Sequence, residues 1–114
     1  MRAFVSEFLG TLFLVATVVG SGIMAENLSV GNQALALLAN AIATGAILYV
    51  LITIFNEISG AHFNPVVSLI MFAMKKLSFS EFLAYVSVQI IGGVLGTFLA
   101  HFMFEISIIQ FSTN

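Results

Sequence analysis

One stretch decides the fold: Ser59-Gly60-Ala61-His62-Phe63-Asn64-Pro65-Val66-Val67-Ser68, where small, polar and imino residues interrupt a sequence that is otherwise mostly hydrocarbon. A loop that carries Gly, His, Asn and Pro at membrane depth is tolerated only if its amides and carbonyls are buried in protein or line a wet cavity. The stretch is therefore predicted to be a pore or binding element.

The rest of the chain has the composition of a membrane protein. Of its 114 residues, 61% are hydrophobic and 7% are charged, with three Lys plus Arg against five Asp plus Glu. A soluble domain with so little charge would expose apolar patches far larger than soluble monomers usually show. The lack of a basic surface excludes a nucleic-acid partner. The absence of cysteine excludes disulfides, thiolate metal sites and cysteine nucleophiles.

Three apolar segments are long enough to cross a bilayer, for which roughly 20 residues are needed. They are expected at about 3–24, 33–55 and 82–104. A cleaved signal peptide is the alternative for the first segment, but that segment is too long and contains Glu7. Because the spans use most of the chain, residues 1–114 are expected to form a single membrane unit.

The apolar run that follows the opening stretch, Val66 to Met74, is too short to cross. At 1.5 Å per residue it covers about half of a ~30 Å hydrocarbon core. Asn64 is a favoured N-cap and Pro65 suits the first helical position, so a helix is expected to start here with its positive end inward. The predicted fold class is an all-α membrane protein with three transmembrane helices plus a re-entrant loop and half-helix at 57–75.

The basic residues predict the orientation of the chain. With three spans and one re-entrant loop, Arg2, Lys75 and Lys76 all lie on one side, whereas the loop at 26–32 and the tail after Glu105 have no basic residue. Lys and Arg concentrate on the cytoplasmic side of membrane proteins. We therefore expect a multi-pass protein of the cell (inner) membrane, with a cytoplasmic N-terminus and an external C-terminus.

Polar residues inside the first two spans have two interpretations each. Glu7 and Thr11 stand four residues apart, so they lie on one helix face. Glu7 is either a functional carboxylate that faces the bundle interior or an interfacial residue that reaches water. Asn40 and Thr44 belong to a small, polar stripe on the second span. That stripe either packs against a neighbouring helix or lines a pore.

The third span begins with a cap and carries two adjacent stripes. Ser78 and Glu81 have the spacing of a capping box. Gly92, Gly96 and Ala100 make a GxxxGxxxA face that allows close helix packing. The polar line beside it consists of Gln89, Gly93, Thr97 and His101. A lone histidine near a span end, without carboxylates and histidines around it, does not indicate a metal site.

These residues resemble the aquaporin, or major intrinsic protein, family in three places. The motifs are Glu7-Phe8-Leu9-Gly10-Thr11 in the first span, SGAHFNPV at 59–66, and Tyr85 with Gln89 and Gly92 in the third span. The segments at 16–24 and 40–45 are most similar to a bacterial branch. The resemblance implies that the chain corresponds to the first half of a fold with six spans and two half-helices that meet at the membrane centre.

The resemblance implies pore roles for the loop and for the start of the half-helix. Asn64 would donate its side-chain amide to the permeating molecule, and Pro65 would start the half-helix. Val66 would stand at the pore in place of the usual alanine of the motif. A ladder of backbone carbonyl acceptors along the pore wall would come from Gly60, Ala61 and His62.

The resemblance also implies roles for residues outside the loop. Glu7 would hold the loop by accepting hydrogen bonds from its backbone N–H groups, and Gln89 would be a second loop-supporting residue. Thr44 would occupy a position that is aromatic in many selectivity filters, and its small side chain implies a wider constriction than that of a strict water pore.

Two hypotheses about function follow. The half-helix end carries about half a positive charge, which repels cations, while the Asn64 amide orients a neutral hydroxylic solute. The first hypothesis is a passive channel, or channel half, for water and small neutral solutes such as glycerol. Its pore would be completed by a second half-channel, either a separate chain or another copy, and the pores would assemble into a homo-oligomer surrounded by membrane lipid. The alternative is a truncated aquaporin-like fragment without transport activity.

An enzyme is the remaining class of function. The sequence contains no recognisable nucleophile and base pair and no cluster of metal ligands. We therefore expect no catalytic residues, metal or cofactor.

Overall fold

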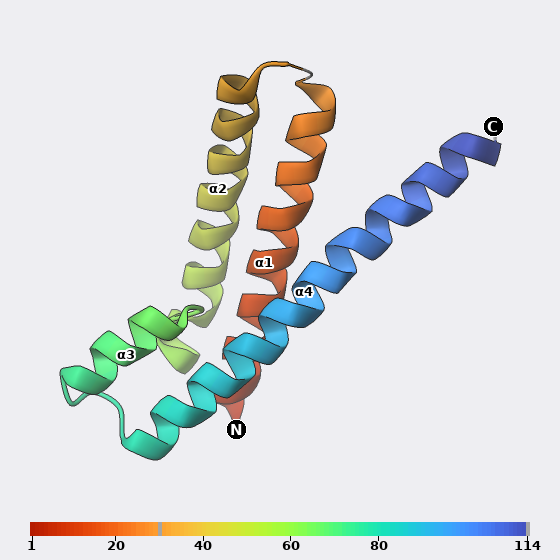
Figure 1. Cartoon of the computed structure of the whole chain (residues 1–114). Helices are drawn as coiled ribbons and strands as arrows, with labels where there is room; N and C mark the ends of the chain where they lie inside the picture. The colour runs from red at the N-terminus through yellow and green to blue at the C-terminus, as the bar shows by residue number, and fades with distance from the viewer. Residues whose placement is uncertain (30, 114) are drawn as a thin grey trace.

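The computed structural model describes residues 1–29 and 31–113. Four helices make up this part of the chain: α1 (Arg2–Leu28), α2 (Gln33–Ser59), α3 (Pro65–Ala73) and α4 (Phe79–Thr113). Helix α1 packs against both α2 and α4, while the short α3 packs against α4. Figure 1 shows α1 and α2 side by side and antiparallel, with α4 crossing α1 obliquely. The predicted all-α fold is confirmed.

Three of these helices are long and apolar enough to cross a membrane, as predicted. They cover Arg2–Leu28, Gln33–Ser59 and Phe79–Glu105, each with 27 residues. At 1.5 Å per residue such a helix is about 40 Å long, which exceeds a ~30 Å hydrocarbon core. Each helix is longer than the apolar segment predicted for it, because the helical backbone continues into the polar residues at its ends.

The end of α2 differs most from the prediction. The re-entrant segment was expected to begin at residue 57, but the helix continues to Ser59. It stops at Gly60, whose left-handed φ of 86° suits a residue without a side chain. The Gly60 N–H donates to the Asn56 carbonyl at 2.9 Å. Asn56 and Glu57 therefore belong to the end of α2.

Polar side chains are buried in this structure, and many large apolar side chains are exposed. The largest fully buried side chains are those of Gln89, Glu7 and Ser68, all polar. Large apolar side chains such as Tyr49 and Leu37 on α2 are more than two-thirds exposed, at 74% and 71%. An apolar exterior is stable in lipid, where burial of hydrocarbon gives no gain and polar contacts hold helices together. The structure therefore depends on its buried polar groups.

Glycines bring α1 and α4 into close contact. Gly92, Gly96 and Ala100 are all buried at this interface, so the predicted close-packing face is confirmed. A Cβ atom at Gly92 would lie 2.6 Å from the carbonyl oxygen of Phe8, and one at Gly96 would meet the carbonyl of Leu12. The two backbones touch, as in other small-xxx-small contacts. This contact sets the position of α4 relative to Glu7 on α1.

The turn between α3 and α4 has a defined backbone geometry. The N–H of Lys76 donates to the carbonyl of Met71 at 2.9 Å, and that of Lys75 donates to Phe72 at 3.0 Å. These two bonds form a Schellman motif. Lys75 has a left-handed φ of 62°, a conformation that costs a residue with a side chain about 1 kcal/mol.

Helix α4 then starts with the predicted capping box. The Ser78 hydroxyl accepts from the N–H of Glu81 at 3.2 Å, and the Glu81 carboxylate accepts from the N–H of Ser78 at 3.0 Å. Two otherwise unpaired N–H groups are satisfied by this exchange. Local hydrogen bonds therefore set the residue at which α4 starts.

Replacing Gly92 by alanine tests the close packing of α1 and α4. The added methyl group would overlap backbone that cannot move aside, so Gly92→Ala is expected to lower the free energy of unfolding by about 1–3 kcal/mol. Gly45→Ala is the matched control, because a Cβ there meets nothing within 4 Å. It is expected to be neutral or to stabilise α2 by up to about 1 kcal/mol. Unfolding in detergent, followed by circular dichroism, measures the stability of both variants. Equal stabilities of Gly92→Ala and Gly45→Ala would contradict the close contact between α1 and α4.

Candidate functional site

The centre of the site is the carboxylate of Glu7, which is completely buried. Its Oε1 accepts from the backbone N–H of Phe63 at 2.8 Å and from Nε2 of Gln89 at 2.9 Å. Its Oε2 accepts from the hydroxyl of Ser59 at 2.6 Å and from the N–H of His62 at 3.0 Å. Four donors thus replace the water that a buried carboxylate loses. The structure places Glu7 inside the bundle and not at the interface.

The loop that Glu7 binds has an unusual backbone. Gly60, Ala61 and Phe63 all have left-handed φ values, of 86°, 54° and 54°. For Ala61 and Phe63 this conformation costs about 1–2 kcal/mol each, and it persists only where surrounding contacts enforce it. The bonds from Glu7 to the N–H groups of His62 and Phe63 provide that enforcement.

The amides and carbonyls of the loop have different partners. Two of its amides bind Glu7, and the N–H of Ala61 donates to the Ser59 hydroxyl at 3.2 Å. No described residue donates a hydrogen bond to the carbonyl oxygens of Gly60, Ala61 or His62. The amides are therefore used for anchoring, while these three carbonyls are left as acceptors.

A second layer of hydrogen bonds joins the loop to α3 and α4. The Ser68 hydroxyl, fully buried, accepts from Nε2 of Gln89 at 3.0 Å and lies 2.9 Å from Nδ1 of His62. The Tyr85 hydroxyl donates to the carbonyl of Ser59 at 2.7 Å. Gln89 therefore bridges Glu7 on α1 and Ser68 on α3, and it links all three helices around the loop.

The start of α3 is exposed. Asn64 caps the helix, because its Oδ1 accepts from the N–H of Val66 at 2.8 Å, and Pro65 occupies the first helical position, as predicted. The side chains of Asn64, Pro65 and Val66 are all exposed. Since the cap uses only the oxygen of the amide, the Asn64 nitrogen remains available as a donor beside the positive end of the helix.

A groove of about 440 Å³ runs from this point along α4. The polar line predicted on the third span borders it, through Gln89, Gly93 and Thr97. Its remaining lining residues include Asn64 and Pro65 from the loop and Thr11 from α1. His101 is exposed and is not among the lining residues. The structure thus brings Asn64 and one face of α4 together along an open groove.

Thr44 lies apart from this groove. Its hydroxyl donates to the carbonyl of Asn40 on the same helix, at 2.8 Å, and the side chain is half-buried. The structure does not bring Thr44 into contact with the loop.

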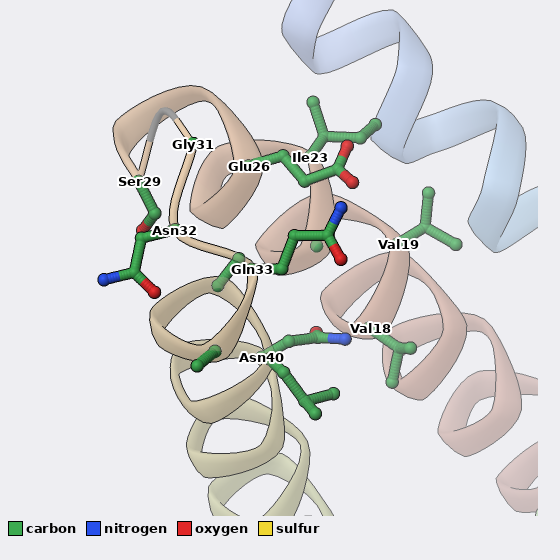
Figure 2. A pocket seen from close by; sticks show the side chains of 13 residues that line it. Val18, Val19, Ile23, Glu26, Ser29, Gly31, Asn32, Gln33 and Asn40 are labelled. Carbon is green, nitrogen blue, oxygen red and sulfur yellow. The ribbon is translucent and has the colours of Figure 1, made fainter.

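Another cavity, of about 870 Å³, lies between α1 and α2 near the turn that joins them. Figure 2 shows the side chains of Glu26, Gln33 and Asn40 around it. Asn40 accepts from the hydroxyl of Ser21 on α1 at 2.7 Å, and its amide lies over Gly22, where a Cβ atom would be 3.8 Å away. Of the two interpretations of Asn40, the structure shows helix packing.

Sequence reasoning missed three residues of the site. Ser59, Ser68 and Tyr85 hold the loop, but they were noted only as parts of motifs. Their signal was present, because each is a hydroxyl in an apolar segment and such a group needs a partner away from lipid. Their partners could not be identified, because Tyr85 and Ser59 are 26 residues apart in the chain.

The amino-acid sequence matches a family model and several known proteins. The family model of the major intrinsic proteins matches residues 1–113. The aquaglyceroporin AqpS of Rhizobium meliloti is 55% identical over 105 residues, covering 92% of this chain and 45% of the relative. An aquaglyceroporin of Toxoplasma gondii is 34% identical, covering 89% and 35%. Aquaporin-2 of Procavia capensis habessinica is 37% identical, covering 88% and 87%. The chain spans less than half the length of the first two relatives.

A variant that replaces one carboxylate oxygen of Glu7 tests the role of this residue. Glu7→Gln keeps the shape of the side chain but turns an acceptor oxygen into a donor nitrogen, so at least one buried donor loses its partner. We expect the free energy of unfolding to fall by about 2–4 kcal/mol. Glu57→Gln, at an exposed carboxylate, is the control and is expected to change it by less than about 0.5 kcal/mol. Thermal unfolding in detergent distinguishes the two, and a Glu7→Gln variant as stable as the control would contradict the anchoring role.

Proposed function

Because the chain belongs to the major intrinsic protein family, we propose that it forms half of a membrane channel that passively conducts water and small neutral solutes such as glycerol. One observation carries the proposal: the Glu7 carboxylate holds the loop so that Asn64, at the N-terminal end of α3, faces an open groove. Two relatives named as aquaglyceroporins support glycerol as a solute.

Selectivity in this proposal comes from the chemistry of the groove. The Asn64 nitrogen donates to the oxygen of a water or polyol, and the carbonyls of Gly60, Ala61 and His62 accept from its hydroxyl groups. The positive end of α3 disfavours cations at the same point. A neutral molecule with donors and acceptors is thus bound weakly at successive positions, as conduction requires.

Two further residues act at the pore in this proposal. Val66 is exposed beside Asn64 but does not line the groove, and the proposal places it where α3 meets the opposite half. Thr44 contributes a small side chain to the constriction, which leaves room for a polyol. Because Thr44 is not among the residues that line the Asn64 groove, the proposal assigns it to a different level of the pore.

A second half is needed to close the groove. The described structure has one half-helix, and the chain has one proline, Pro65. Transport folds of this type pair inverted repeats around a midplane site. We propose that a second half-channel covers the groove, and that an inverted copy of this chain does not supply it, because the basic residues favour one orientation. Complete pores then associate into a homo-oligomer in the cell membrane.

The membrane orientation is part of the proposal. Figure 1 shows the N-terminus and the turn between α3 and α4 at the same end of the molecule. These two segments carry Arg2, Lys75 and Lys76, all the basic residues of the chain. We place this end on the cytoplasmic side of the inner membrane.

Stopped-flow light scattering from proteoliposomes tests the channel. Three preparations are compared: the chain alone, the chain with the second half of a full-length relative, and empty liposomes. We expect water and glycerol flux above the empty liposomes only when both halves are present. Flux from the chain alone would show that copies complete the pore, and no flux from correctly inserted pairs would contradict the proposal in favour of a fragment without transport activity.

The variant Asn64→Asp tests the contact between Asn64 and the solute while it keeps the fold. Aspartate caps helices as well as asparagine does, so the loop and α3 remain in place. The donor nitrogen becomes an anionic oxygen, which attracts cations instead of donating to a solute. We expect glycerol flux in the two-half channel to fall at least about tenfold, or cation exclusion to be lost. Unchanged flux and unchanged ion exclusion would remove Asn64 from the pore.

A further inference from the structure

The turn between α3 and α4 forms a second polar site, unrelated to the groove. A depression of about 650 Å³ lies here, bordered by Lys75, Lys76 and Ser78. Both lysine side chains are exposed. Their backbone N–H groups are held by the Schellman motif, so both side chains leave from a fixed turn. Two of the three cations of the chain therefore stand side by side at one small concavity.

Aromatic rings adjoin the charged rim. The ring of Phe72 stacks on that of Phe82 at 5.1 Å and lies 5.8 Å from that of Phe79. Phe72 and Phe79 both line the depression, and Phe79 is 61% exposed. An apolar wall next to two ammonium groups matches an amphiphile with an anionic head and a hydrocarbon tail. A soluble anion would make no use of the rings.

One carboxylate also borders the depression, and it has a structural task. Glu81 accepts from the N–H of Ser78 in the capping box. Two ammonium groups and one carboxylate leave the concavity with one net positive charge, which complements a head group with one net negative charge. A zwitterionic head group gains less from this charge balance.

We propose that this depression binds the head group of an anionic phospholipid, with the phosphate between Lys75 and Lys76 and an acyl chain along Phe79. The proposal rests on the membrane placement given above, which puts the turn at the cytoplasmic surface. Anionic lipids of that leaflet attract basic residues close to it. The bound lipid ties the end of α3 to the start of α4, so it stabilises the half-helix from the side opposite Asn64.

Native mass spectrometry of the full chain in detergent tests the site without any transport measurement. Dioleoyl phosphatidylglycerol and dioleoyl phosphatidylcholine differ only in the head group. Because each lysine near an anionic head group contributes roughly a fivefold gain, and Glu81 opposes them, we expect phosphatidylglycerol to bind about tenfold more tightly. In the double variant Lys75→Gln with Lys76→Gln the preference is expected to fall to about twofold or less.

Two single variants test whether the loss of lipid preference comes from this site, rather than from a general loss of positive charge or from misfolding. Arg2→Gln removes the remaining cation at the same end of the molecule and is expected to keep the preference. Lys75→Gly relieves the left-handed conformation, so it is expected to weaken phosphatidylglycerol binding about fivefold while thermal stability without lipid stays equal or rises. Equal binding of the two lipids to the unmodified chain, or an equal loss in Arg2→Gln, would overturn the proposal. Displacement of the lipid by an equal concentration of inorganic phosphate would overturn it in favour of a free anion site.

Discussion

The structure depends on one carboxylate in a helix that is otherwise apolar. An ionisable group inside a membrane span costs about 2.5–3.5 kcal/mol unless it finds partners, and Glu7 finds four, from α2, the loop and α4. In lipid, helices gain little from burying hydrocarbon against each other. The need to satisfy Glu7 therefore does what a hydrophobic core does in a soluble domain: it brings distant segments to one place.

Local signals in the sequence predicted much of this arrangement, because each concerned groups a few residues apart. Asn64 followed by Pro65 indicated where α3 begins, and Ser78 with Glu81 indicated the start of α4. Glycines at intervals of four indicated a close helix contact, and the structure shows that its partner is α1. A cap or a helix face is complete within about one turn of chain. The pore roles of the loop residues and of Thr44 stay predictions, since they concern a solute and a second half.

What the sequence did not reveal depends on long-range contacts or on backbone conformation. The bonds of Tyr85 to Ser59 and of Gln89 to Ser68 join residues 26 and 21 positions apart, and no local pattern pairs them. Ala61, Phe63 and Lys75 have left-handed backbones at positions where the residue type does not require one. Such conformations are imposed by neighbours, so they become visible only when the neighbours are placed. The extension of α2 to Ser59 is a different case, because Gly60 is a local stop signal and Glu57 is not, so this boundary could have been predicted from the sequence.

The partners of Glu7 also constrain the order in which the chain can assemble. They follow it by 52 to 82 positions, and a growing chain enters the membrane from its N-terminus. Helix α1 is therefore present, with its carboxylate unsatisfied, while α2, the loop and α4 are still being made. An unpaired acidic group favours water or the membrane surface over the lipid interior. The polar centre around Glu7 can therefore close only after the loop and Gln89 have been made.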